Sequence, residues 1–131
     1  MSGEEFGDVR AIALIRLAKE FQYAYEHWIW TYAKLRSHQK TKRLLEQFES
    51  DCQVRGWKLS ETLKEDIRRE IEAQDHHIKG ALGELCRYYA HLRRLEREIS
   101  KVLDWCWNWR SGFGVDADAE WESNRCSECS E

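Results

Sequence analysis

The sequence predicts an all-α fold, a long antiparallel helical hairpin that dimerises into an elongated four-helix bundle. The chain has 131 residues with no proline, and 34% of them are charged. Apolar residues recur with alternating spacings of four and three through two long stretches, which is the rhythm of helices that pack along their length. A break at residues 56–60 separates these stretches. We therefore expect a hairpin domain over 1–114 with arms at 9–55 and 61–110, each of about 45–50 residues.

We expect the first arm to begin at Asp8, which can cap a helix and directly precedes the apolar pattern. Ser2 and Glu5 have the spacing of an earlier cap, but Gly3 and Gly7 disfavour a helix there. Its seam follows the spacing of four and three from Leu14 to Leu35, and further apolar residues flank this seam. A stripe of that width is more than one partner helix can cover. A basic segment with few apolar residues follows at 36–43, where the arm is either continuous helix or broken by a loop.

The second arm has clear start signals. Gly56 predicts the end of the first arm, because glycine readily adopts the left-handed conformation found after helices. Ser60 is the expected N-cap of the second arm, with Glu61 near the positive end of the helix. The seam then continues without a slip to Trp109. We expect one unbroken helix over residues 60–110, about 75 Å long.

A hairpin that turns near residue 58 brings together residues whose numbers add to about 116. This pairing rule places Gln39 and Lys42, in the polar interruption of the first arm, opposite His77 and Gln74 in the second arm. Two polar interruptions at one level avoid burying either of them against apolar residues. The match favours antiparallel pairing of the arms within the chain.

Tryptophans mark the end of the second arm. Trp105 and Trp109 lie four residues apart and share a helix face, whereas Trp107 points elsewhere. The pairing rule places these side chains beside Phe6 and Val9, where they close the open end of the hairpin.

The apolar surplus lies in the half of the hairpin away from the turn. We expect self-association through that half, as a two-fold homodimer. The residues expected at the oligomer interface are Ile15, Leu17, Trp28, Ile29, Leu82, Tyr89, Leu103 and Trp105.

Charge is distributed unevenly along the chain. Residues 116–131 contain six acidic residues and one arginine, while the body is weakly basic. This composition predicts a disordered acidic tail over 115–131. Basic side chains gather on one outer face of the second arm and in the basic segment of the first. The residues suited to phosphate or an acidic partner are Arg87, Arg93, Arg94, Arg97, Lys101, Arg36, Lys40, Lys42 and Arg43.

No catalytic constellation is recognisable, so we expect a protein that is not an enzyme and uses no cofactor. The adjacent His76 and His77 point about 100° apart on a helix and do not readily share a ligand. Five cysteines, an odd number, favour reduced thiols over a disulfide framework. Cys126 and Cys129 form a CxxC pair, but a zinc site needs four ligands and no second pair accompanies them. We therefore expect no metal site.

Two functional classes fit these observations. We favour an interaction protein that binds another protein through aromatic-rich helical faces, because Trp and Tyr concentrate at interface anchors. The alternative is a dimer that binds double-stranded RNA or nonspecific duplex, with Arg87, Arg94 and Lys101 on the phosphates. No apolar run is long enough for a membrane span and the acidic N-terminus does not resemble a signal peptide. We expect an intracellular protein, cytoplasmic or nuclear.

Overall fold

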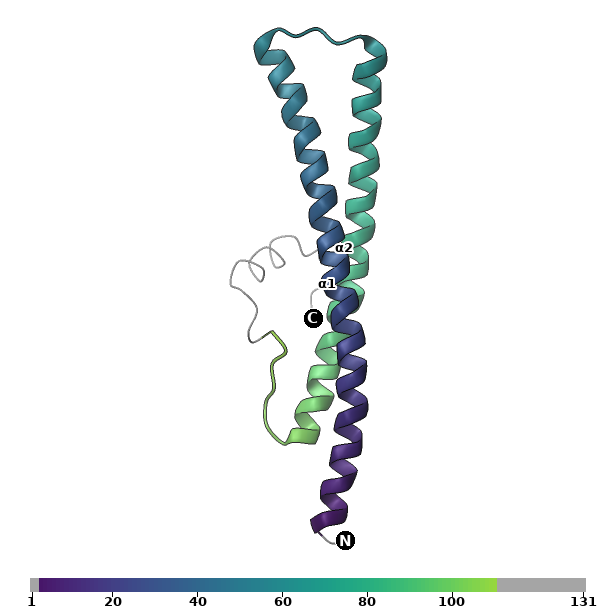
Figure 1. Ribbon diagram of the computed structural model, residues 1–131, viewed down its shortest axis with the longest axis vertical. Coiled ribbons are helices and arrows are strands. Elements are labelled where there is room, and N and C mark those ends of the chain that lie inside the picture. The colour runs from purple at the N-terminus through teal and green to yellow at the C-terminus, as the bar shows by residue number, and fades with distance from the viewer. Residues whose placement is uncertain (1–2, 111–131) are drawn as a thin grey trace.

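Two long helices form the protein, joined by a short connection (Figure 1). The computed structural model describes residues 3–110. Helix α1 runs over Gly3–Arg55 and helix α2 over Glu61–Leu103, so the prediction that the first helix begins at Asp8 was wrong. They lie antiparallel and pack against each other, which confirms the predicted hairpin. No strand occurs within the described residues, so the all-α prediction is confirmed as well.

Helix α1 continues without a break through residues 36–43, so the basic segment is helix and not a loop. The segment contains neither glycine nor proline, and most of its side chains have good helix propensity. Contact with α2 adds support, because Lys42 Nζ lies 2.6 Å from Asp75 Oδ1 in an ion pair. The hydrogen bond to Asp75 raises the pKa of Lys42 above its usual value.

The connection forms as the sequence predicts. Gly56 adopts a φ of 70°, in the left-handed region that glycine enters without steric cost. Trp57 N donates a hydrogen bond to Cys52 O at 2.9 Å, which satisfies one of the last carbonyls of α1. Ser60 caps α2, since its hydroxyl oxygen accepts a hydrogen bond from Leu63 N at 3.2 Å.

The antiparallel register follows the pairing rule. The rings of His27 and Tyr88 stack with their centroids 5.6 Å apart, and their residue numbers add to 115. His38 Nδ1 lies 2.7 Å from Gln74 Oε1, a pair whose numbers add to 112. The polar interruptions of the two arms therefore meet at one level, as predicted.

The polar side chains at this level form hydrogen bonds with one another. Gln74 is buried, and its Nε2 donates a hydrogen bond to Glu70 Oε1 at 2.9 Å. Its amide oxygen therefore faces His38, and because an amide oxygen only accepts, His38 carries its hydrogen on Nδ1. The His38 ring also stacks on His77, with the centroids 4.8 Å apart.

Helix α2 ends at Leu103, so the prediction of a helix to Arg110 was wrong. Asp104 ends the helix with a φ of 61°, a left-handed conformation that aspartate tolerates better than most residues. The chain then reverses, and residues 104–110, here called the return segment, run back along the hairpin (Figure 1). The heptad spacing of the sequence continues through Trp109, but the helix ends before it. Trp109 lies in the return segment and is buried from there against the two helices.

The core sits in the half of the hairpin away from the turn. Leu35, Leu85 and Leu92 have no exposed surface there. Between residues 36 and 73, by contrast, Cys52 alone is buried. Figure 1 shows the two helices spreading apart toward the turn, which accounts for the poorer burial in that half.

Candidate functional site

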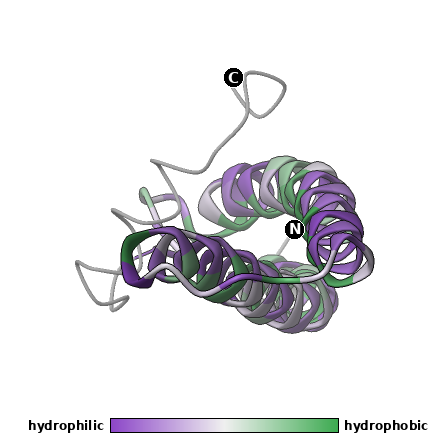
Figure 2. Cartoon of the chain, turned by 90° about the horizontal axis from the view of Figure 1, so that it is seen from above, coloured by the Kyte–Doolittle hydropathy of each residue, from purple (hydrophilic) through white to green (hydrophobic). Residues whose placement is uncertain are grey.

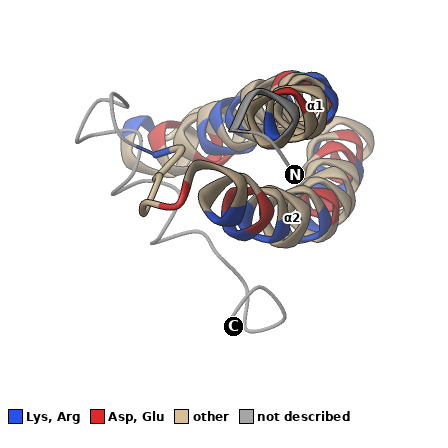
Figure 3. Ribbon diagram, turned by 90° about the horizontal axis from the view of Figure 1, so that it is seen from below, with Lys and Arg blue, Asp and Glu red and all other residues tan. Residues whose placement is uncertain are grey.

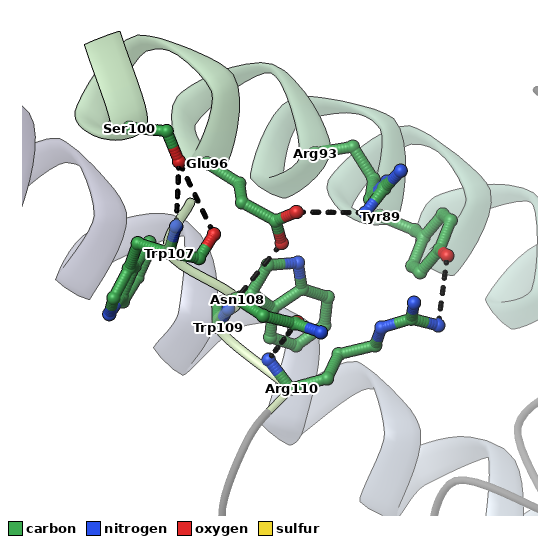
Figure 4. A network of polar contacts seen from close by, with 8 residues as sticks. All are labelled: Tyr89, Arg93, Glu96, Ser100, Trp107, Asn108, Trp109 and Arg110. Carbon is green, nitrogen blue, oxygen red and sulfur yellow. Dashed lines mark hydrogen bonds and ion pairs between the residues drawn. The ribbon is translucent and has the colours of Figure 1, made fainter. Parts of the chain in front are cut away.

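The return segment is held on α2 by polar contacts (Figure 4). Ser100 Oγ accepts a hydrogen bond from Trp107 N at 3.0 Å and donates one to Trp107 O at 3.4 Å. The carboxylate of Glu96, which is buried, accepts from Arg93 Nη1 at 2.9 Å and from Trp109 N at 3.4 Å. A buried carboxylate needs such partners, because an unpaired one would lose its hydration without compensation. Glu96 thus couples the return segment to the body of α2.

The end of the return segment is held as well. Arg110 Nη1 donates a hydrogen bond to Tyr89 Oη at 3.4 Å. Arg110 N donates to Asn108 Oδ1 at 2.9 Å, which closes a local turn. Side-chain contacts from about three turns of α2 therefore hold a segment that has no regular structure of its own.

Aromatic contacts also hold the return segment, which forms a third layer over the two helices. The Trp107 ring meets Phe21 edge-on at a centroid distance of 5.1 Å. Trp109 meets Trp28 at 5.5 Å and both Tyr25 and Tyr89 at 6.1 Å. Such edge-to-face pairs contribute about 0.5–1.5 kcal/mol each beyond their buried area. The return segment therefore adds apolar packing to both helices.

The predicted placement of the tryptophans was wrong. They lie beside Phe21 and Trp28 rather than beside Phe6 and Val9, because the chain reverses at Asp104. Trp105 and Trp109 share no helix face either, since the side chain of Trp105 is 58% exposed and that of Trp109 is 5% exposed.

Part of the surface expected at an oligomer interface is covered within the chain. Leu17, Trp28 and Tyr89 are only 4–6% exposed, because α2, α1 and the return segment pack over them. The remaining expected residues divide into Leu82 and Leu103, which are half-buried, and Ile15, Ile29 and Trp105, which are exposed.

Exposed apolar side chains are concentrated on α1. Among the described residues, ten exposed large hydrophobic side chains belong to α1 and only Leu63 belongs to α2. Figure 2 shows hydrophobic positions on the outside of the hairpin as well as between the helices. A helix that is apolar on two sides is suited to packing against two neighbours, and α2 supplies only one of them.

The outer face of α1 is defined here by six exposed residues that recur every three or four positions: Ile12, Ile15, Lys19, Tyr23, Glu26 and Trp30. At 100° per residue they lie roughly opposite the buried Leu17, Ala24, Trp28 and Leu35. From first to last they span about 27 Å of helix. Sequence reasoning did not select Tyr23 and Trp30, although their spacing from Ile12 and Ile15 marks a second stripe.

Neighbouring groups support the aromatic side chains of the outer face of α1. Lys34 Nζ lies 4.8 Å from the centroid of the Trp30 ring in a cation–π contact. Tyr23 lies against His27 with the ring centroids 4.3 Å apart. A shallow hollow of about 210 Å³ is lined by Glu26, His27 and Trp30. The outer face thus combines flat aromatic surface with a recess beside it.

The basic residues on α2 form no ridge of one sign. Arg93 is paired with buried Glu96, and Lys101 Nζ lies 3.4 Å from Glu98 Oε1. Arg94 contacts His91 through Nη2 and Nδ1. Figure 3 shows acidic residues interspersed with basic ones over the outer faces of both helices. The predicted positions that are exposed are Arg87, Arg94, Arg97, Lys101, Lys40 and Arg43, and those that are half-buried are Arg36, Lys42 and Arg93.

Two further hollows lie elsewhere on the described residues. A hollow of about 520 Å³ near the turn is lined by residues that include Cys52, Trp57, Lys64 and Arg68. A groove of about 300 Å³, almost wholly apolar, is lined by residues that include Leu14, Phe21, Trp105 and Trp107. Within residues 3–110, no three His, Cys, Asp or Glu side chains converge as metal ligands would.

The cysteines depart from expectation at one position. Cys52 and Cys106 are free thiols, but Cys86 is disulfide-bonded, so the prediction of reduced thiols was wrong there. An odd number of cysteines excludes complete pairing and does not exclude a single bridge. Cys126, Cys129 and the predicted acidic tail lie outside the described residues.

No helix within the described part of the chain combines the length and the apolar character that crossing a membrane requires. No protein-family model, curated protein or solved structure matches this chain.

Proposed function

We propose that this protein is a non-enzymatic, self-associating helical interaction protein that binds through the outer face of α1. The observation that carries this proposal is the exposure of Ile12, Ile15, Tyr23 and Trp30, whose side chains are 57–69% exposed on a helix already packed on its opposite side. Exposed apolar side chains gathered on one helix face in this way mark an interaction site on a folded chain. Trp and Tyr are also the residues that most often anchor interfaces.

The interface expected from the sequence shares Ile15 with the outer face of α1 but also includes Trp28 and Tyr89. Trp109 of the return segment packs against both of these residues. A second hairpin would have to displace these contacts before it could bind. The outer face of α1 needs no such displacement, which favours it as the binding surface.

Analytical ultracentrifugation tests the proposal. The wild-type chain should show a concentration-dependent rise from monomer to dimer mass at micromolar concentrations. The double variant Ile12→Ser with Trp30→Ser should stay monomeric, because it removes apolar surface from the outer face without disturbing the core. Circular dichroism should show unchanged helix content in this variant.

A matched control is available on the same helix. Val54 is 83% exposed and lies outside the outer face, so Val54→Ser should dimerise like the wild type. A wild-type chain that remains monomeric over the whole concentration range would contradict self-association. A double variant that dimerises normally would contradict the assignment of the surface.

Binding of a nucleic-acid duplex is a second candidate, favoured by the exposure of Arg87 and Arg94 on α2. It has less support, because Lys101 and Arg93 are paired with carboxylates. A gel-shift assay with duplex RNA at low salt decides the matter, and we expect no retardation. Retardation that weakens with salt and is lost in Arg87→Glu with Arg94→Glu would favour this candidate instead.

A further inference from the structure

We infer that the outer face of α1 binds the same face of a second copy of this chain, antiparallel, about a two-fold axis between Gln22 and Tyr23. The inference rests on the proposed function and specifies its partner and geometry. It is carried by the order of charged and apolar residues along the outer face.

The charged residues of this face are placed symmetrically. Lys19 and Glu26 are both exposed and lie at equal distances in sequence on either side of the midpoint between Gln22 and Tyr23. A two-fold axis at that midpoint brings Lys19 level with Glu26 of the partner subunit, and the reverse contact forms by symmetry. Both contacts then join opposite charges, which favours the encounter and sets its register.

The apolar residues are compatible with the same axis. Ile15 comes level with Trp30 of the partner subunit, so that a branched side chain meets a flat aromatic ring. Ile12 comes level with Ala33 of the partner subunit, a small residue that leaves room for it. The two charge contacts thus lie nearest the axis, and on each side of the axis two apolar contacts lie beyond them.

A parallel pair of α1 helices in register would behave differently. Lys19 would then face Lys19 of the partner subunit, and Glu26 would face Glu26 of the partner subunit. Like charges held opposite each other are destabilising, so the charge order selects the antiparallel arrangement. The fold also permits it, because α2 packs on the opposite side of α1.

The side chain of Glu26 is already oriented along the helix in the single chain. Its Oε1 accepts a hydrogen bond from Gln22 Nε2 at 3.1 Å. A carboxylate has about four acceptor positions, so this contact leaves acceptor capacity for an incoming lysine. Gln22 therefore steadies the carboxylate without occupying it fully.

A charge-swap cycle measured by analytical ultracentrifugation tests the inference. Lys19→Glu and Glu26→Lys each replace two attractive contacts with two repulsive ones, and each should raise the dimer Kd about tenfold or more, equivalent to about 1.4 kcal/mol. The double variant Lys19→Glu with Glu26→Lys restores opposite charges across the axis. Its Kd should return to within about threefold of the wild type, a difference well below the tenfold step.

Mixing the two single variants gives a second readout. All four facing charges become complementary in the mixed dimer, so the mixture should associate more tightly than either variant alone. The control is Lys79→Glu, which changes the net charge equally at an exposed position on α2 and should leave the Kd unchanged.

The outcomes separate this inference from the proposed function. If Ile12→Ser with Trp30→Ser abolishes the dimer but single charge reversals leave its Kd unchanged, the register is overturned and the binding surface stands. If single reversals weaken the dimer and the double swap does not restore it, the two-fold register is again overturned. If the wild type does not dimerise, both the proposed function and this inference fall.

Discussion

In the terminal half of the hairpin, away from the turn, α1 and α2 enclose a core in which Leu85 and Leu92 have no exposed surface. Near the turn the same two helices bury only Cys52 between residues 36 and 73. Seam residues Ile67 and Ile71 of the turn half keep the regular apolar spacing of α2 and are nonetheless only half-buried. Regular spacing therefore does not by itself decide how well a seam is covered.

The difference between the halves lies in the number of layers. In the terminal half the return segment packs against both helices and places Trp107 and Trp109 over the groove between them. In the turn half no third layer exists among the described residues, and the helices spread apart (Figure 1). Two helices alone bury a narrow seam, and a third element is needed to remove water from its sides.

Weakening the third layer should cause the largest loss of stability in the terminal half. Trp109→Ala should lower the free energy of unfolding by about 3–5 kcal/mol, the range for truncating a buried tryptophan. Urea denaturation followed by circular dichroism measures the change. Trp105→Ala is the matched control and should cost far less, because Trp105 remains exposed. Equal losses in the two variants would contradict the covering role of Trp109.

A leucine truncation in each half sharpens the comparison. Leu92→Ala should cost about 2–5 kcal/mol, because it empties space in a packed core. Leu63→Ala, in the turn half, should cost under about 1 kcal/mol, because Leu63 is exposed and most of its surface already meets water. Native-state hydrogen exchange should likewise show slower exchange for the terminal half of each helix. Similar costs for the two leucines would argue that the halves are equally packed.

The smallest expected effect concerns the polar layer that separates the halves. The hydrogen bond to Asp75 raises the pKa of Lys42 above its usual value. The stabilisation that this contact gives the folded state is therefore fully present below the usual pKa of lysine and is lost as the pH rises through the raised pKa. The difference in unfolding free energy between wild type and Lys42→Ala should therefore be constant near neutral pH and shrink in strongly alkaline solution. A difference that grows with alkaline pH would have the opposite sign to this linkage.

Several features of the fold could be predicted from local sequence. Gly56 and Ser60 marked the connection because their side chains suit a left-handed residue and an N-cap. The meeting of the two polar interruptions was predictable because each would otherwise face apolar residues. His38 and Gln74 realise that match directly.

The candidate site was predicted only in part. Of the residues expected at the oligomer interface, Ile15 and Ile29 are exposed on α1, whereas Leu17, Trp28 and Tyr89 lie in the core. The sequence shows that α1 has more apolar surface than one helix can cover. It does not show which part of that surface the return segment leaves uncovered, because that depends on where the chain reverses.

The sequence by itself determined the two helices, their connection and their antiparallel register, because propensity, capping and apolar spacing act over short distances along the chain. Only the tertiary structure decided that α2 ends at Leu103 and that Trp109 is buried from outside the helix. A heptad position marks a side chain suited to burial and does not record the direction from which its partners come. The partners of Trp109 belong to two helices that are already paired with each other. The third layer therefore depends on the tertiary structure of that pair.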